Sequence, residues 1–261
     1  MAYNAVTLGR VRFSYVKLKD PSRVTADGNK REFVPQAVVN RILAEEGANS
    51  EKLEGLEYGI QLIIGKDDKI PNSDTLIMDA LGEKVKLAVA EAVEEKRLSE
   101  AQAELMNKHW RDKFALSIAS KTQLKTKVTD NDEQGDEQTP AHLVNTYSFN
   151  VNPKAKRGPV PVFKWGTNPS TGKPGPVKAD VEEVHSGDYG FVELVPFVYR
   201  FAGSTGLTFF LNSVLKTQDG ERLDGVRDAG AAFEGLGDYM DEVSNDGAEA
   251  YSSAESIDDV L

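Results

Sequence analysis

The feature that most constrains the fold is a long apolar run in the C-terminal third of the chain. Residues Tyr189–Phe201 are apolar on both faces of an extended strand, and Gly187 stands just before them. Residues Ser204–Gly206 are typical of a turn, and a second apolar run, Leu207–Leu215, follows them. Two such runs joined by a short turn predict a β-hairpin. The sequence therefore predicts an antiparallel sheet with this hairpin at its centre.

Shorter patterns predict the rest of the fold. Apolar and polar residues alternate around Val11–Tyr15, Tyr58–Ile64 and Tyr147–Val151, which is typical of half-buried strands. Apolar residues at three- and four-residue steps predict a short helix over Pro35–Leu43 and a helical insertion over about residues 74–116. Five strands without a regular alternation of strand and helix favour a small closed antiparallel β-barrel over a parallel α/β sheet. The predicted fold class is mainly β with a helical insertion.

The helical insertion contains a tryptophan that has two interpretations. Trp110 follows Ala103 and Met106 at helical spacing, so core packing is favoured over a role in base stacking. Ser99 and Gln102 have the spacing of a capping box, which predicts that a second helix of the insertion begins there.

The charge of the chain is unevenly distributed. The sequence has 42 Asp and Glu against 31 Lys and Arg, a formal charge of −11. Ten of the acidic residues lie within residues 228–261, where there is no Lys or Arg, so the remaining 32 nearly balance the 31 basic residues. Between Gln138 and Ala179 there are six basic residues and no acidic one. A basic zone on a balanced body, followed by an acidic tail, is typical of a protein that handles a polyanion.

The domain organisation follows from this distribution. We predict one folded domain over residues 1–227, with a basic loop at about residues 153–178, and a flexible, disordered acidic tail over residues 228–261. The Pro-rich loop is expected to contain one edge strand, because proline cannot donate a hydrogen bond within a sheet. A charge run is often only a solvated surface, so that interpretation stays open for each run.

Several classes of function are disfavoured. The chain has no Cys, which excludes disulfides, thiolate metal sites and cysteine nucleophiles. Its three His lie far apart, and Gly166–Lys173 departs from the spacing of a phosphate loop and precedes a proline. The sequence has neither a signal-peptide pattern nor a stretch apolar enough to span a membrane. We therefore expect a soluble intracellular protein that is not an enzyme and that needs no metal or cofactor.

Aromatic and basic residues interleave through the predicted β-rich body. This combination suits single-stranded nucleic acid, because exposed bases stack on aromatic rings while cations follow the phosphates. Trp165 is the first stacking candidate, since its Lys-Trp-Gly segment lacks the periodicity of a buried element. Core packing is the competing interpretation for the other aromatic residues. The predicted binding residues are Arg10, Arg12, Tyr15, Lys121, Lys125, Lys127, Tyr147, Phe149, Lys154, Lys156, Arg157, Phe163, Lys164, Trp165, Tyr199 and Arg200.

Four segments carry a family resemblance over about residues 8–236. They are GRVRFSYV at residues 9–16, Tyr58–Asp68, Tyr147–Val162 and Ser186–Gly225, with Phe233 as a closing aromatic residue. These segments resemble a family of bacteriophage single-stranded-DNA-binding proteins that have one OB-fold and an acidic C-terminal tail. The helical insertion is variable in such proteins. The chain ends in Val260 and Leu261, where related proteins often end on an aromatic residue.

The resemblance implies an OB-fold, a five-stranded antiparallel β-barrel, in a protein that coats and protects single strands during phage DNA replication and recombination. It implies two kinds of partner, single-stranded DNA and the phage or host replication and recombination proteins that bind the tail, and no membrane. It is compatible with a homo-oligomer or a cooperative filament on DNA, in the cytoplasm of the infected bacterial host. The tail residues expected to bind partners are Asp241, Glu242, Asp258, Asp259 and Leu261.

Two other classes of protein stay open. A phage structural or protein-interaction factor without nucleic-acid binding would associate with its partners whether or not nucleic acid is present. An acidic decoy of DNA, a second example of this class, would carry its carboxylates on the folded surface, whereas here they lie in a tail. A nuclease is the enzyme alternative, and the sequence offers it no metal-ligand cluster.

Overall fold

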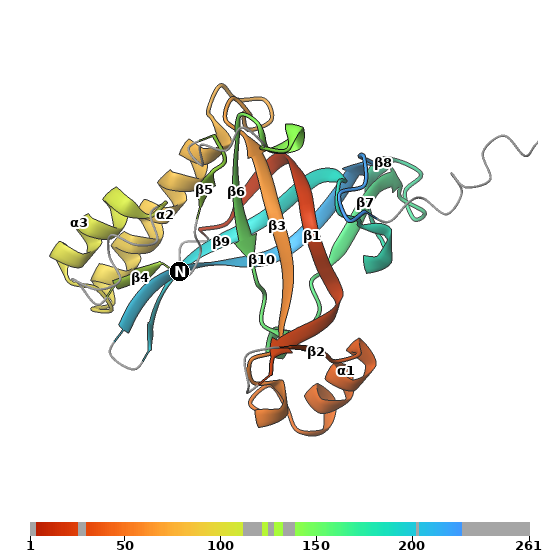
Figure 1. Ribbon diagram of the computed structural model, residues 1–261, viewed down its shortest axis with the longest axis horizontal. Helices are drawn as coiled ribbons and strands as arrows, with labels where there is room; N and C mark the ends of the chain where they lie inside the picture. Colours follow the sequence, from red (N-terminus) through yellow and green to blue (C-terminus); the bar gives the residue numbers. More distant parts are fainter. Residues whose placement is uncertain are drawn as a thin grey trace, which may run out of the picture. The chain divides into compact units, whose positions relative to one another are not determined.

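The protein is mainly β-sheet in the residues that its computed structural model describes. Those residues are 4–25, 30–111, 122–124, 128–132, 139–201 and 204–225. Within them, ten strands form one sheet and three α-helices flank it (Figure 1). The chain divides into two units, Met1–Asp224 and Gly225–Leu261, and every element below belongs to the first. The predicted fold class, mainly β with a helical insertion, is confirmed.

The sheet has more strands than the sequence predicts. The strands are β1 Val6–Val24, β2 Arg31–Phe33, β3 Glu57–Gly65, β4 Thr122–Leu124, β5 Thr129–Asp130, β6 Thr146–Val151, β7 Val162–Thr167, β8 Pro174–Lys178, β9 Tyr189–Phe201 and β10 Ser204–Gln218. Their order is β5-β6-β3-β1-β9-β10-β7-β8, with β2 paired to β1 and β4 paired to β10. A closed five-stranded barrel was predicted, but in the described part of the chain the sheet is open. Its strand order extends past β10 to β7 and β8, and within those residues β8 does not pair back with β5 at the other end.

The predicted hairpin corresponds to β9 and β10, which are neighbours in the middle of this order. β9 has the predicted bounds and pairs antiparallel with β10 along its whole length. Ser204–Gly206 pair with Tyr199–Phe201, so they belong to β10 and not to the predicted turn. Val192 and Leu194 are buried in the core, whereas Phe197 is 37% exposed. One face of the apolar run therefore forms core and the other is an aromatic outer face.

The core lies between the inner face of the sheet and the helical insertion. Phe13 of β1, Leu62 of β3 and Phe149 of β6 are almost fully buried in it. Helix α2, Ile77–Glu94, packs on β9 and β1 and adds Leu81 and other apolar side chains of one face. Each such side chain contributes roughly 1.5–3 kcal/mol when it is fully buried, so this core stabilises the sheet without disulfides.

The helices confirm the sequence prediction. Helix α1, Gln36–Glu45, begins after Pro35 and ends before Gly47, whose φ of 81° suits glycine. Helix α3, Glu100–His109, begins with the predicted capping box of Ser99 and Gln102. Trp110 is 7% exposed and its ring lies edge-on to Phe209, which confirms core packing. Figure 1 shows α2 and α3 side by side at one end of the sheet and α1 beside the β1–β2 end.

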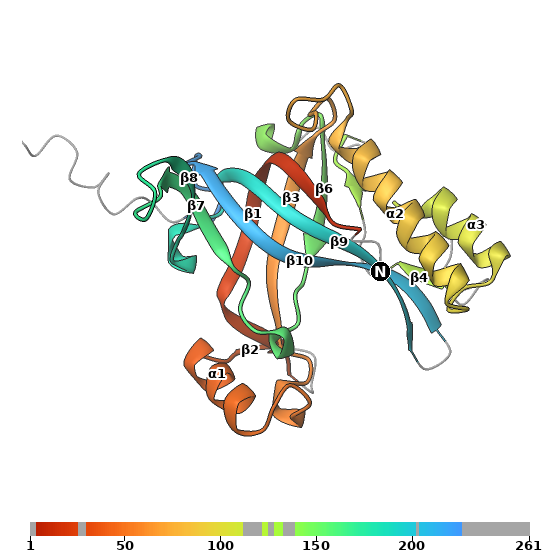
Figure 2. The same ribbon diagram turned by 180° about the vertical axis from the view of Figure 1, so that it is seen from behind.

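The Pro-rich segment contains two strands instead of one strand and a long loop. β7 pairs in parallel with β10, and β8 pairs antiparallel with β7 (Figure 2). Pro174 and Pro176 fit β8 because it ends the sheet order, where a missing N–H breaks no ladder. Trp165 lies in β7 and is 56% exposed. Its neighbours Val162 and Phe163 show the alternation of a strand, buried and half-buried in turn.

Candidate functional site

Two residues of β1 have a left-handed backbone on the outer side of the sheet. Arg10 has a φ of 39° and Tyr15 a φ of 45°. At the first, the register of β1 shifts against β9, and at the second it shifts against β3. A bulge of this kind redirects the side chain, and a positive φ at a non-glycine residue is uncommon. Tyr15 consequently projects from the sheet and is 69% exposed.

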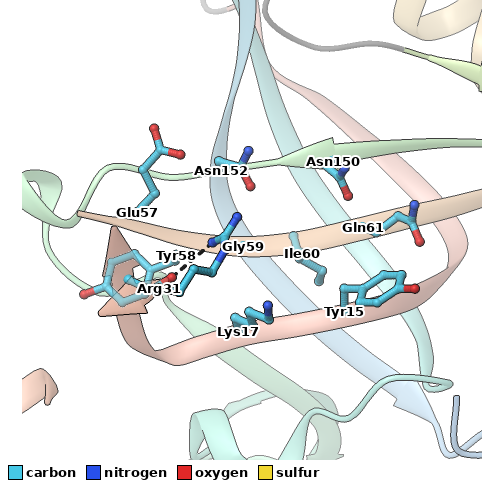
Figure 3. Close-up of a pocket in the computed structure, with 11 residues that line it drawn as sticks. Tyr15, Lys17, Arg31, Glu57, Tyr58, Gly59, Ile60, Gln61, Asn150 and Asn152 are labelled. Atoms are coloured by element: carbon cyan, nitrogen blue, oxygen red, sulfur yellow. Dashed lines mark hydrogen bonds between the residues drawn. The ribbon is translucent and has the colours of Figure 1, made fainter. Parts of the chain in front are cut away.

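Tyr15 lies on a polar groove formed by β1, β3 and the end of β6. The groove has a volume of about 310 Å³. Figure 3 shows Lys17 on the same strand as Tyr15, with Gln61 on β3, Asn150 on β6 and Asn152 just after β6. The residues that line this Tyr15 groove are Tyr15, Lys17, Ser22, Arg31, Glu57, Tyr58, Gly59, Ile60, Gln61, Asn150 and Asn152. The groove therefore combines an exposed ring with three side-chain amides.

The Tyr15 groove has an excess of positive charge. Glu57 is the one carboxylate among its lining residues, and it forms an ion pair with Lys154 of the predicted basic loop. Arg31 donates a hydrogen bond to the hydroxyl of Ser22 at 3.2 Å, a neutral partner. The side chain of Lys17 is exposed and forms no ion pair or hydrogen bond with the described residues. The charges of Lys17 and Arg31 are thus left to attract an anion.

The side chains of Arg10 and Arg12 form a second cluster of positive charge on the same strand as Tyr15. Their guanidinium carbons lie 5.2 and 5.4 Å from the ring centroid of Tyr189. Arg12 donates hydrogen bonds to the carbonyl oxygens of Gly187 and Glu221, and Arg10 donates one to the side chain of Gln218. These acceptors are neutral, so none of these hydrogen bonds pairs a guanidinium with a carboxylate. The half-buried ring of Tyr189 lies beneath them.

Trp165 lies on a second, apolar groove, formed by β1, β9, β10, β7 and β8. This groove has a volume of about 580 Å³. Its floor includes the half-buried side chains of Phe163, Phe191 and Leu215, and Glu193 is its one carboxylate. The residues that line this Trp165 groove are Thr7, Phe163, Trp165, Pro176, Phe191, Val192, Glu193, Ser213 and Leu215. The structure thus brings together the two predicted aromatic residues Phe163 and Trp165 around one groove.

The remaining predicted residues of the basic loop are partly neutralised. Lys164 forms an ion pair with Glu183. The guanidinium carbon of Arg157 lies 3.5 Å from the ring centroid of Phe210, and burial lowers the pKa of Arg157. Lys156 is exposed on a separate small pocket. These three residues line neither groove.

The structure separates the other predicted residues. Phe149 is 1% exposed and packs on Phe209 with ring centroids 5.6 Å apart, so no ring face is open to a base. The alternation of apolar and polar residues around Phe149 therefore reflects packing in the core. Tyr147 is half-buried, with the Nζ atom of Lys66 5.3 Å from its ring centroid. Tyr199 is half-buried as well, and burial raises its pKa.

Arg200 is exposed at the end of β9 opposite Tyr189. It lines a pocket of about 350 Å³ that also has Lys96 and Arg97 on its surface. The predicted residues Lys121, Lys125 and Lys127, and the tail residues Asp241, Glu242, Asp258, Asp259 and Leu261, lie outside the described residues.

The described residues offer no arrangement for metal chemistry. Among them, no group of three or more His, Asp or Glu side chains is placed to hold a metal ion. His142 is half-buried, and burial together with the charge of Arg12 lowers its pKa. None of the helices in the described ranges has both the length and the apolar character needed to cross a membrane.

Sequence reasoning missed several residues of the two grooves. Lys17, Arg31 and Gln61 were not predicted, nor were the amides of Asn150 and Asn152. Gln61 interrupts the apolar run of β3, and Asn150 alternates with buried residues of β6. A polar residue at an outward position of a buried strand is the signal that could have identified both.

A family comparison places the chain among known proteins. A family model described as the ssDNA-binding protein of Enterobacter phage Enc34 matches residues 45–246. The chain belongs to this family. The resemblance stated from the sequence is thereby confirmed. No protein among the curated sequences matches the chain.

Solved structures of two phage proteins are similar over most of the chain. The single-stranded DNA-binding protein from bacteriophage Enc34, in complex with ssDNA, is 16% identical. The match covers 85% of this chain and 90% of that chain, with a TM-score of 0.47. The single-stranded DNA-binding protein gp2.5 encoded by bacteriophage T7 is 13% identical, with 98% of each chain covered and a TM-score of 0.37.

Proposed function

We propose that this protein binds single-stranded DNA without sequence preference, with the Tyr15 groove as a principal contact. The observation that carries the proposal is the exposed ring of Tyr15 beside the unpaired cation Lys17. Membership in the family described by a phage ssDNA-binding protein supports it. The proposal includes no catalytic step, because binding needs only the ring, the amides and the cations of this surface.

The chemistry of the groove suits an unpaired strand. A base stacked on an aromatic ring contributes about 1–3 kcal/mol, and each base has a ring face, so stacking does not depend on sequence. In a duplex both faces of a base are already stacked on its neighbours, so Tyr15 favours single strands. Lys17 and Arg31 lie where they can contact phosphates. The side-chain amides of the groove both donate and accept hydrogen bonds, so they can contact any base edge.

The test is a titration followed by fluorescence anisotropy. Labelled oligo-dT and a duplex of equal length are titrated with the full chain at several salt concentrations. We expect preferential binding of oligo-dT, with affinity that falls as salt rises because counterions are released from the phosphates. Equal affinity for both, or no binding of either, would contradict the proposal and favour a protein-interaction factor.

The wider role proposed for the protein is to coat and protect single strands during phage DNA replication and recombination. In this role it acts in the cytoplasm of the infected bacterial host. The acidic residues 228–261 would recruit replication and recombination proteins through residues such as Asp241, Glu242 and Leu261. The same carboxylates would compete with phosphates for the cationic groove, because tethering keeps their local concentration high.

Removal of residues 228–261 tests the role of the tail. We expect the shortened chain to bind oligo-dT more tightly than the full chain at matched salt, and to lose binding to polymerase or helicase partners. A matched control replaces the ten acidic residues of the tail by their amides and keeps its length. Equal or weaker DNA affinity in both variants would contradict competition by the tail.

A further inference from the structure

The outer face of the sheet is continuous from the Tyr15 groove to the Trp165 groove. Residues paired in register lie on the same face of a sheet. Arg12 of β1 is in register with Ile63 of β3, which is buried at 3% exposure, and with the half-buried Tyr189 of β9. Two residues along β9, Phe191 pairs with Leu215 of β10, and Leu215 pairs with Phe163 of β7. One face therefore runs across five successive strands, from β3 to β7.

The space between the two grooves suits a chain of nucleotides. Neighbouring strands lie about 4.8 Å apart, so four steps from β3 to β7 span roughly 19 Å along the sheet. Single-strand-binding domains of OB type occupy about 4–16 nucleotides. One strand of DNA within that size range can therefore reach both grooves.

Cations lie along this face between the grooves and beside the second one. Arg10 and Arg12 lie over Tyr189, and their hydrogen bonds go to neutral acceptors. Lys178 of β8 pairs in register with Phe163, so it shares the face of Trp165. The side chain of Lys178 is exposed and forms no ion pair or hydrogen bond with the described residues.

The Trp165 groove has one carboxylate, Glu193, against the three cations Arg10, Arg12 and Lys178 beside it, and this excess of positive charge favours an anionic occupant. A second copy of the chain could cover the apolar rings, but it would leave the charges of Arg10, Arg12 and Lys178 without anionic partners unless it presented carboxylates to each. A single strand supplies both requirements at once, with bases for the rings and phosphates for the cations. The continuity with the Tyr15 groove favours the same occupant for both.

We propose that the Trp165 groove is a second base-stacking subsite, and that one DNA strand crosses the sheet from Tyr15 past Tyr189 to Trp165. This inference rests on the proposed function. It adds that binding is bipartite, with a polar, cationic subsite on one side of the sheet face and an apolar, aromatic one on the other. The affinity should therefore rise with oligonucleotide length until a strand reaches both grooves.

The fluorescence of tryptophan provides the first readout. The chain has two Trp, and Trp110 is buried at 7% exposure, so a bound base quenches mainly Trp165. We expect oligo-dT of about 16 nucleotides to quench the fluorescence of the full chain. In the Trp165→Phe variant the quenching should be lost while binding, followed by anisotropy, is retained.

The second readout is the affinity as a function of length. Trp165→Ala should weaken binding of the long oligonucleotide roughly 5- to 150-fold and remove most of the gain in affinity between about 4 and about 16 nucleotides. Leu87→Ala is the matched control, because Leu87 is 50% exposed on α2 and lies in neither groove. Because the side chain of Trp165 is exposed, its variants should unfold at the same temperature as the unsubstituted protein.

Each outcome separates the two proposals. If the full chain binds no oligonucleotide, the proposed function itself fails. If the full chain binds and the affinity of Trp165→Ala rises with oligonucleotide length as much as that of the unsubstituted protein, only the second subsite is overturned. The same holds if the full chain binds without quenching of tryptophan fluorescence. A Trp165→Ala variant that changes sedimentation and not DNA affinity would overturn it in favour of contact between copies of the chain.

Discussion

The Tyr15 groove and the Trp165 groove lie on one sheet face and differ in chemistry. The first is lined by amides, hydroxyls and two cations around one exposed ring, and the second by apolar side chains around an exposed indole. Electrostatic attraction to phosphates weakens as salt rises, whereas stacking depends on it little. The Tyr15 groove therefore combines stacking with electrostatic attraction, whereas the Trp165 groove offers mainly stacking, so substitutions in the two grooves should differ in their effect on salt dependence.

The largest expected effect comes from Asp188, a buried residue that lines neither groove. Asp188 is 2% exposed, lies between Gly187 and Tyr189, and accepts hydrogen bonds from the ammonium of Lys216 and the backbone N–H of His185, each at 2.8 Å. Asp188→Ala leaves Lys216 half-paired in a buried setting, so we expect a loss of roughly 3–5 kcal/mol in the free energy of unfolding. Chemical denaturation measures it.

The control for this variant changes the exposed partner of the same ammonium. Asp219 lies 2.7 Å from Lys216 and its side chain is 90% exposed. Asp219→Asn should cost about 1 kcal/mol or less, since exposed ion pairs contribute little. Equal losses for Asp188→Ala and Asp219→Asn would show that burial of Asp188 is unimportant.

The next effect concerns stacking in the Tyr15 groove. Tyr15→Ala removes the exposed ring and should weaken binding of oligo-dT by about 1–3 kcal/mol, with the slope of affinity against salt unchanged. Tyr15→Phe keeps the ring and should bind nearly as the full chain does. Anisotropy titrations at several salt concentrations measure both quantities. A change in slope without a change in affinity at low salt would be inconsistent with stacking.

The smallest effect isolates the electrostatic contribution. Lys17→Ala should reduce the slope of log affinity against log salt by about 0.7, the value for one phosphate contact on a single strand. Trp165→Ala should leave that slope unchanged. Lys108→Ala is the matched control, because Lys108 is exposed on α3 and lies in neither groove. If Lys17→Ala and Lys108→Ala have the same slope, Lys17 contacts no phosphate.

The sequence predicted the elements that depend on local pattern. The apolar run of β9, the capping box at Ser99 and the core position of Trp110 all follow from periodicity over a few residues. The parallel pairing of β7 with β10 was not predictable, because it joins Phe163 to Leu215 across a long separation in sequence.

The candidate site was predicted only in part, because local sequence patterns do not show which distant residues become neighbours. Trp165 was predicted as the first stacking candidate within a loop; it is 56% exposed, but it lies in strand β7. Lys154 was predicted as a DNA-binding residue of the basic loop, but Glu57, 97 residues away in sequence, forms an ion pair with it. Single residues do not reveal such partners. The grooves themselves depend on which strands become neighbours, which the local pattern leaves undetermined.

The left-handed backbone at Tyr15 and Arg10 has a consequence for engineering. A non-glycine residue in this conformation costs roughly 1–2 kcal/mol, and glycine adopts it without that cost. A selection for heat resistance alone would therefore tend to place glycine at both positions. These two substitutions would remove the exposed ring from the Tyr15 groove and the Arg10 guanidinium from the surface between the two grooves. The resulting protein would be more stable to heat and would bind DNA with lower affinity.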